Sequence, residues 1–387
     1  MLERIGNVIM PTRLKDSENA IVGMEKSNIY GIAYENNGYA YTGWSDDQGL
    51  YIFIQFVNKF FSLTVVESIG LFYLLVLSIG FLLYFISGFL LFKEKKTRLF
   101  FNVWLVLLTL LAFKIRDVYI MFYFTVSFIP IFIYFLKKEY SKKYLILFSL
   151  LLIVGVFMQI SNYFRGYSGT LVILFICTYL LFSKINPKIK AISISILFAG
   201  LIFTKIFWNY SIENPRKIFI EQVGTDKPMS KSHPFWHTVY IGFGYIDNNI
   251  VEKYLDEVAF EKVKSINPNA TCCTPEYEDI LKNEVIQILI KHPLLFVSTV
   301  GAKIGVYLVY FILFINLGLY FFIKNIIKTS LRETVPFVVA LLFSLIFGIL
   351  AIPSLSYSLG FLSIIMVFVS YVMDNSFYKN HKNFKKV

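Results

Sequence analysis

The chain has 387 residues, of which 57% are apolar and 18% aromatic, whereas only 16% are charged. Average soluble domains carry about a quarter charged residues, so this composition excludes a soluble enzyme, a disordered chain and a disulfide scaffold. The apolar residues gather in runs of about 20, which is the length of helix that crosses a bilayer. The sequence therefore predicts an all-α polytopic membrane protein.

Apolar runs separated by short charged connectors predict nine transmembrane helices. The last run is long enough for two helices, and we expect it to break near residues 353–357, where Pro353 interrupts the helical pattern. The runs are 69–92, 99–113, 118–136, 144–160, 170–183, 191–208, 294–323 and 335–373.

The formal net charge of +12 divides unevenly between two alternating sets of connectors. One set holds 18 Lys or Arg and only four acidic residues. Because the cytoplasmic loops of membrane proteins are enriched in Lys and Arg, this set is predicted to be cytoplasmic. The basic pI then reports topology and gives no reason to expect a nucleic-acid partner. The set consists of 93–98, 137–143, 184–190, 324–333 and the tail 374–387.

This topology divides the chain into five parts. Residues 1–68 form an outer first loop with juxtamembrane helices, 69–208 hold helices 1–6, 209–293 form a large outer loop, 294–373 hold helices 7–9, and 374–387 form a basic cytoplasmic tail. We expect a location in the cytoplasmic (inner) membrane. No predicted span precedes the first loop, so either a first helix has been lost, which we favour, or the N-terminal region lies in the membrane interface.

The two outer segments contain several stretches with helical spacing of apolar residues. The pattern predicts a compact cap of short helices over the bundle rather than an independent β-domain. The expected helices are 16–28, 50–61, 252–264 and 276–291. The adjacent Cys272 and Cys273 imply no disulfide framework, because neighbouring cysteines rarely pair with one another.

The first outer segment has a distinctive layout of acidic residues and glycines. Asp16 opens the loop, Gly31 follows fifteen residues later, and the stretch 49–51 (Gly-Leu-Tyr) leads into an apolar run. This layout resembles the first external loop of the GT-C integral-membrane glycosyltransferases, in the branch of the protein O-mannosyltransferases and the lipid A aminoarabinose transferase. Three features differ from the family: Asp-Ser-Glu replaces an Asp-Glu pair, Asp-Gln-Gly replaces two prolines, and the first span is absent.

The resemblance implies a GT-C-like fold and a defined reaction. A sugar would pass from a polyprenyl-phosphate or -diphosphate carrier to an envelope glycan or lipid acceptor at the outer face of the membrane. A carboxylate must deprotonate or orient the acceptor hydroxyl. Asp16 is the favoured candidate, and Glu18 and Asp47, with the neighbouring Asp46, are alternatives. These acids could equally be solvated loop residues, with Asp16 capping a helix.

Basic residues on the outer side are candidates for holding the donor phosphate. Lys114 and Arg116 lie in one short outer turn and Arg165 lies in the next, where positive charge is otherwise depleted. Lys303 lies deep inside a predicted span, and an ionisable group at such a depth is a functional-site hypothesis. The alternatives are arginines that reach up to lipid head groups and, for Arg116, an ion pair with Asp117.

Histidine and aromatic side chains are candidates for binding the acceptor. His233, Trp236 and His237 lie in the second outer segment, and plain loop packing is the alternative for them. Tyr357 lies in the last outer turn, where many GT-C members carry an Arg-Tyr pair, but the arginine is missing here. The two histidines are four residues apart, yet one pair is an incomplete ligand set, so no metal or other cofactor is predicted and a divalent metal is the less favoured alternative.

Three other functions remain open. The first is an O-antigen or capsule polymerase or ligase, the second a polysaccharide transporter or flippase, and the third a non-catalytic subunit of an envelope-assembly complex. A transporter is disfavoured because the sequence shows neither a repeat nor an acidic residue within the spans. The predicted partners are a lipid-linked sugar donor, a glycan or lipid acceptor, and membrane lipids, with no nucleic acid.

Overall fold

The computed structural model describes ten stretches of the chain, and these are helical except for one short hairpin. Eight of the described helices are long and apolar enough to cross a membrane. The prediction of an all-α polytopic membrane protein is therefore confirmed at the level of architecture. The stretches are residues 32–35, 38–41, 48–61, 63–115, 117–137, 144–223, 234–272, 274–316, 318–327 and 329–384.

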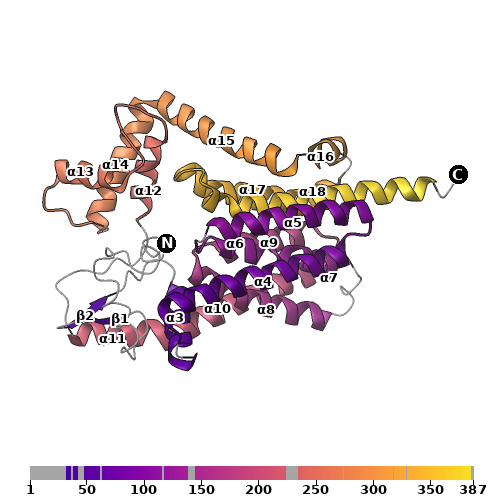
Figure 1. Cartoon of the computed structure of the whole chain (residues 1–387), viewed down its shortest axis with the longest axis horizontal. Coiled ribbons are helices and arrows are strands. Elements are labelled where there is room, and N and C mark those ends of the chain that lie inside the picture. The colour runs from indigo at the N-terminus through magenta and orange to yellow at the C-terminus, as the bar shows by residue number, and fades with distance from the viewer. Residues whose placement is uncertain are drawn as a thin grey trace.

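The described bundle contains one apolar helical segment for each of the nine predicted spans (Figure 1). The third segment is a pair of consecutive helices, α6 (Ile120–Val126) and α7 (Phe128–Lys137). The fifth, α9 (Ser168–Phe182), has only 15 residues and is shorter than the other eight. The others are α4 (Val65–Leu91), α5 (Lys95–Ile115), α8 (Tyr144–Phe164), α10 (Pro187–Trp208), α15 (Pro293–Ile315), α17 (Leu331–Leu350) and α18 (Leu355–Phe384).

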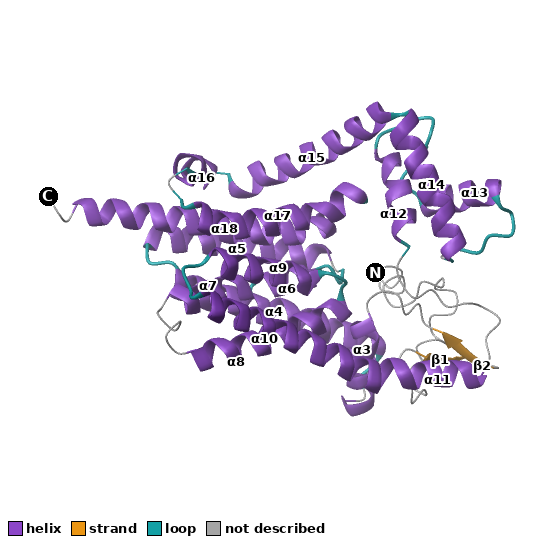
Figure 2. Cartoon of the chain, turned by 180° about the vertical axis from the view of Figure 1, so that it is seen from behind, coloured by secondary structure: helices purple, strands orange, loops and turns teal. Residues whose placement is uncertain are grey.

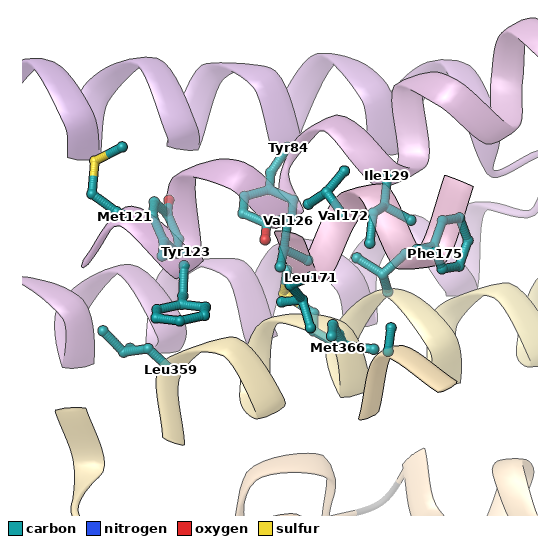
Figure 3. Close-up of a cluster of buried hydrophobic side chains, with 14 of the residues drawn as sticks. Tyr84, Met121, Tyr123, Val126, Ile129, Leu171, Val172, Phe175, Leu359 and Met366 are labelled. Atoms are coloured by element: carbon teal, nitrogen blue, oxygen red, sulfur yellow. The ribbon is translucent and has the colours of Figure 1, made fainter. Parts of the chain in front are cut away.

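The core of the bundle forms around α18, whose apolar segment is buried on most sides, whereas most other spans expose much of their surface. Figure 3 shows side chains from α4, α6, α7, α9 and α18 meeting in this core, among them Tyr84, Tyr123, Phe175 and Met366. Apolar side chains such as Leu74 face outward. An apolar exterior around helices that satisfy their own backbone hydrogen bonds suits a lipid solvent.

Helices α8 and α10 approach each other closely at two glycines. A Cβ atom at Gly155 would overlap the carbonyl oxygen of Leu197, and one at Gly200 would overlap that of Leu152. Small residues at such positions let the backbones of membrane helices come into contact. This pair of glycines therefore fixes the distance between the two helices.

We expect Gly200→Leu to lower the melting temperature of the detergent-solubilised protein. The added side chain has no room against α8, and overpacking of this kind costs about 1–3 kcal/mol. Gly70→Leu on α4 is the matched control, because a Cβ atom there meets nothing within 4 Å. Thermal unfolding followed by tryptophan fluorescence compares the two variants, and equal melting temperatures would argue against the close approach.

The predicted span 294–323 is wrong in its C-terminal part, because α15 ends at Ile315 and a separate helix, α16 (Gly318–Ile326), follows. The break occurs at Asn316, whose φ is 46°. A positive φ is uncommon for residues other than glycine, and asparagine is among those that adopt one most often. The predicted break between the last two spans is confirmed, because α17 ends at Leu350 and α18 begins at Leu355.

The first polar segment contains a helix and a hairpin (Figure 2). The helix α3 (Gln48–Phe61) was predicted, whereas the antiparallel pair of β1 (Ile32–Glu35) and β2 (Gly38–Tyr41) was not. In the register of this pair, Ile32 lies opposite Tyr41 and Glu35 lies opposite Gly38. The predicted helix 16–28 lies outside the described residues.

The second polar segment starts as a continuation of α10. A π-helical turn, η3 (Asn209–Glu213), leads directly into α11 (Asn214–Val223). Pro215 has no amide hydrogen to donate into an α-helical ladder, and a wider turn just before it accommodates the missing bond. The predicted outer loop from residue 209 thus begins as helix.

The rest of this segment forms a small helical module, residues 234–292, with a core of its own. Its elements are α12 (Phe235–Gly242), η4 (Phe243–Tyr245), α13 (Asp256–Ile266) and α14 (Pro275–Lys291). The predicted helices 252–264 and 276–291 are confirmed as α13 and α14. The buried core includes Tyr240, Val251, Ala259, Val263, Tyr277, Leu281 and Val285.

The described parts of both polar segments lie at one end of the bundle, and α18 runs to the other end (Figures 1 and 2). At the C-terminal end, Asp374 accepts hydrogen bonds from the backbone amides of Lys93 and Glu94, both at 2.9 Å. Glu333 accepts a hydrogen bond from the Tyr371 hydroxyl at 2.7 Å. Acidic residues of the basic connectors thus serve to tie the helix ends together.

We predict that the end carrying α3 and the module faces the outside of the cell, because the basic connectors lie at the opposite end. Ser265 on α13 and Lys184 between α9 and α10 are both exposed. In a background without native cysteines, a membrane-impermeant maleimide should label Ser265→Cys in intact cells and label Lys184→Cys only after the membrane is opened. The reverse pattern would invert the topology.

Candidate functional site at the polar end of the bundle

The short turn between α8 and α9 fixes the position of Arg165. Asn162 accepts hydrogen bonds from the backbone amides of Gly169 and Thr170, at 2.8 and 3.1 Å, so the end of α8 is tied to the start of α9. Tyr167 adopts a left-handed φ of 68°, which closes the turn. The backbone of Arg165 is therefore held rigidly at the polar end.

The Arg165 side chain contacts Tyr119, which stands just before α6. The guanidinium donates a hydrogen bond to the Tyr119 hydroxyl, and its central carbon lies 4.1 Å from the centre of the tyrosine ring. Burial raises the pKa of Tyr119 well above its ordinary value, and this effect outweighs the opposite effect of Arg165. Tyr119 is therefore a neutral phenol that can still donate or accept a hydrogen bond.

Tyr357 completes this aromatic and cationic cluster from the first turn of α18. Its ring centre lies 4.6 Å from that of Tyr119. Ser354 accepts a hydrogen bond from the Tyr357 amide at 3.4 Å and so caps the start of the helix. Arg165, Tyr119 and Tyr357 are called the Arg165 cluster below, and they come from three segments far apart in the sequence.

The helical module docks next to this cluster. Tyr254, between η4 and α13, lies close enough to Tyr357 to interact with it electrostatically, and burial raises the pKa of Tyr254 above its ordinary value. Gly242 lies directly against the carbonyl oxygen of Leu350, where a larger residue would clash. The module thus contacts the bundle at residues 349–357, which run from the end of α17 to the first turn of α18.

Lys303 reaches the same turn from α15. It is only 1% exposed, and its ammonium donates a hydrogen bond to the carbonyl oxygen of Ile349 at 2.9 Å. The ammonium also lies 5.7 Å from the centre of the Tyr245 ring of η4. Three predicted site residues therefore lie around the turn between α17 and α18. Lys303 contacts Ile349 at the end of α17, and Tyr357, in the first turn of α18, belongs to the same cluster as Arg165.

His237 has its ring buried in the core of the module. Its Nδ1 lies 2.6 Å from the Tyr277 hydroxyl and its Nε2 lies 3.0 Å from the Asp256 carboxylate. These contacts join α12 to α14 and α13, respectively. Both ring nitrogens thus have partners within the module, an arrangement that serves packing of the helices.

The other predicted residues lie apart from the cluster or outside the described chain. Trp236 is half-buried, and its amide donates a hydrogen bond to Glu278 at 2.8 Å. Lys114 is exposed in the last turn of α5, and no contact joins it to the Arg165 cluster in the described residues. Five predicted residues are not described: Asp16, Glu18, Asp47, Arg116 and His233.

The start of α3 packs directly beside the Arg165 turn. A Cβ atom at Gly49 would come within 2.7 Å of the Phe164 ring and 2.9 Å of its amide nitrogen. The Phe164 ring also stacks on Phe72, with ring centres 5.2 Å apart. The first turn of α3, which directly follows Asp47 in the sequence, is therefore anchored next to Arg165.

Tyrosines are the functional candidates that sequence reasoning missed. Tyr119, Tyr245 and Tyr254 make the contacts that join the cations, the turn between α17 and α18, and the module. The chain contains 26 tyrosines, so composition and spacing single out none of these three. Among the described residues, no three His, Cys, Asp or Glu side chains gather to hold a metal ion, and the absence of a metal cofactor stays a prediction.

Comparison with known proteins gives no match to this chain: no family model, no curated protein and no solved structure is similar to it. The class that fold and composition define is a polytopic helical membrane protein. The assignment of function therefore depends on the Arg165 cluster and its surroundings.

Proposed function

We propose that the protein is a membrane glycosyltransferase that moves a sugar from a polyprenyl-phosphate or -diphosphate carrier to an envelope glycan or lipid acceptor. The observation that carries the proposal is the convergence of Arg165, Tyr119 and Tyr357 at the polar end of an apolar bundle. A fixed guanidinium at the end of the spans suits the phosphate of a donor whose lipid tail remains in the bilayer.

The chemistry assigned to this cluster is stabilisation of a leaving group. In the transfer, an acceptor hydroxyl attacks the anomeric carbon of the sugar, and the bond from that carbon to the phosphate oxygen breaks. Negative charge then develops on the phosphate, where a guanidinium and a neutral phenol can stabilise it through hydrogen bonds. Arg165 and Tyr119 supply these two groups.

A carboxylate must take the proton of the acceptor hydroxyl. Asp16, Glu18 and Asp47 are the candidates from the first polar segment. The layout of the sequence favours Asp16. All three acids lie outside the described residues, but we prefer Asp47 in this proposal because Gln48 and Gly49, which follow it directly in the sequence, begin α3, and Gly49 packs against Phe164, next to Arg165. We assign the role of general base to Asp47 in this proposal.

The acceptor is proposed to approach from the side of the module. Trp236, with the preceding His233, would supply surfaces for a sugar ring, since aromatic faces pack well against apolar sugar faces. His237 is assigned a supporting role, because its ring holds α12, α13 and α14 together. The proposed location is the outer face of the cytoplasmic membrane.

The test is transfer by the purified full chain in lipid nanodiscs. Polyprenyl phosphates that carry different labelled hexoses or pentoses are the donors, and extracted envelope glycans and lipids are the acceptors. We expect label to move to an acceptor while free polyprenyl phosphate accumulates. If no label moves with any donor, the proposal is wrong. If the intact labelled lipid instead crosses the bilayer of liposomes with its sugar still attached, the protein is a flippase.

A further inference from the structure

One face of α15 is polar although the helix lies among apolar spans. Thr299, Lys303 and Tyr307 follow one another at intervals of four residues, so they share one face of the helix. They are 3%, 1% and 2% exposed, respectively. The opposite face carries exposed apolar side chains such as Ile304 and Leu308. The polar face therefore points into the protein.

The ammonium of Lys303 has more hydrogen-bonding capacity than its surroundings use. It carries three N–H donors, and one of them binds the Ile349 carbonyl oxygen. The Tyr245 ring offers a weaker attraction at 5.7 Å. No carboxylate forms an ion pair with it in the described part of the chain. A buried ammonium without a counter-charge is costly, so the site is suited to an anion.

Thr299 offers a second donor on the same face. Its hydroxyl is buried and has no hydrogen-bond partner among the described residues. It lies one helical turn before Lys303, so a group bound beside the ammonium is within reach of both side chains. A phosphate, which presents several acceptor oxygens to separate donors, fits this arrangement.

The burial of Lys303 at the polar end of the bundle decides which kind of phosphate can reach it. Lys303 is 1% exposed, and its ammonium lies beside Ile349, at the end of α17 where the module docks. A free phosphate ion would lose its hydration on entering such a buried position between apolar helices, at high cost. A phosphate carried on a lipid tail already lies at the membrane boundary and is drawn in with its apolar chain.

We infer that Lys303 and Thr299 form a buried binding site, at the polar end of the bundle, for the phosphate of a polyprenyl phosphate. This inference rests on the proposed function and extends it, because it adds a second phosphate-binding position and a second donor residue, Thr299. Tyr245 covers the ammonium from the module. The site is therefore complete only when the module is docked on the bundle.

The experiment measures binding of farnesyl phosphate to the full chain in nanodiscs of phosphatidylcholine. We expect Lys303→Met to weaken binding by about tenfold or more, since a charge-assisted contact is lost, and Thr299→Val to weaken it severalfold. Lys205→Met on α10 is the matched control, because this lysine also lies on an apolar helix of the bundle but is exposed. The control should bind like the unaltered protein.

Melting temperatures without ligand separate binding from folding. Replacing an uncompensated buried charge with an apolar group of similar size is neutral or stabilising, so Lys303→Met should melt at the same or a higher temperature. A markedly lower melting temperature together with normal farnesyl phosphate binding would show that Lys303 has only a structural role and would overturn the inference. Lys303→Gln provides a second variant with a smaller change in polarity.

Competition identifies the ligand. Inorganic phosphate and dioleoyl phosphatidic acid should displace farnesyl phosphate poorly, and farnesol should not displace it. Equal competition by inorganic phosphate or by phosphatidic acid would overturn the assignment to a polyprenyl carrier. If the protein binds farnesyl phosphate through Lys303 but transfers no sugar, the proposed function fails and this inference stands. If sugar transfer and farnesyl phosphate binding are both normal in Lys303→Met, this inference fails and the proposed function stands.

Discussion

Arg165→Ala is expected to weaken binding of a polyprenyl-phosphate-linked sugar by about 10- to 100-fold, the scale of one lost hydrogen bond to a charged group. The guanidinium lies at the polar end of the bundle and is held by the α8–α9 turn and by Tyr119. Alanine removes both its charge and its planar set of donors. The apparent affinity for donor should fall, and binding is measured directly with a labelled donor in nanodiscs.

Two variants separate the role in binding from the role in packing. Arg165→Lys keeps the charge but loses the planar group, so we expect intermediate affinity. Lys114→Ala removes an exposed cation in the last turn of α5 that does not contact the cluster in the described residues, so this variant should bind donor normally. Loss of affinity in Lys114→Ala equal to that in Arg165→Ala would mean that general positive charge, and not the cluster, attracts the donor.

Arg165 could be selected from the sequence because positive charge is scarce on short outer turns, and that signal is local. Its partners could not be selected. Tyr119 is 46 residues away in the chain, and nothing in the sequence distinguishes it from the many other aromatic residues. The meeting of Arg165 with Tyr119 and Tyr357 depends on how α6, α8 and α18 pack, and no local pattern encodes this.

The apolar runs predicted the transmembrane helices well, because a lipid-facing helix must be apolar along its whole length. The same signal failed at Asn316. There the composition stays apolar on both sides, and one residue with a positive φ ends α15. The hairpin of β1 and β2 was missed for a related reason, since two strands of four residues each are too short to show a period of two.

His237 shows how a candidate site residue can be explained by packing. The spacing of His233 and His237 suggested a ligand pair, but Tyr277 and Asp256, which are 40 and 19 residues away, occupy both ring nitrogens of His237. A sequence alone cannot show that a polar side chain is already satisfied. Lys303 is the opposite case, because its depth in a span was visible in the sequence and the structure adds its incomplete set of partners.

Asp47→Asn is expected to lower turnover by about 100-fold or more while the affinity for the lipid-linked donor stays unchanged. General base catalysis contributes on the order of 10²–10⁴-fold to a rate, and an amide cannot accept the proton of the acceptor hydroxyl. The change is nearly isosteric, so the fold should be retained. The assignment depends on the first turn of α3, where Gly49 packs against Phe164 beside Arg165.

Two variants of the same chemical kind test whether Asp47 is the carboxylate that matters. Asp16→Asn and Glu18→Gln remove the other two candidate acids, and each should leave turnover within severalfold of the unaltered protein. Single-turnover transfer from a labelled donor and equilibrium binding of the same donor are measured for all three. A loss of turnover in Asp16→Asn together with normal turnover in Asp47→Asn would assign the general base to Asp16. In that case the packing of α3 against the Arg165 turn would have a structural role only.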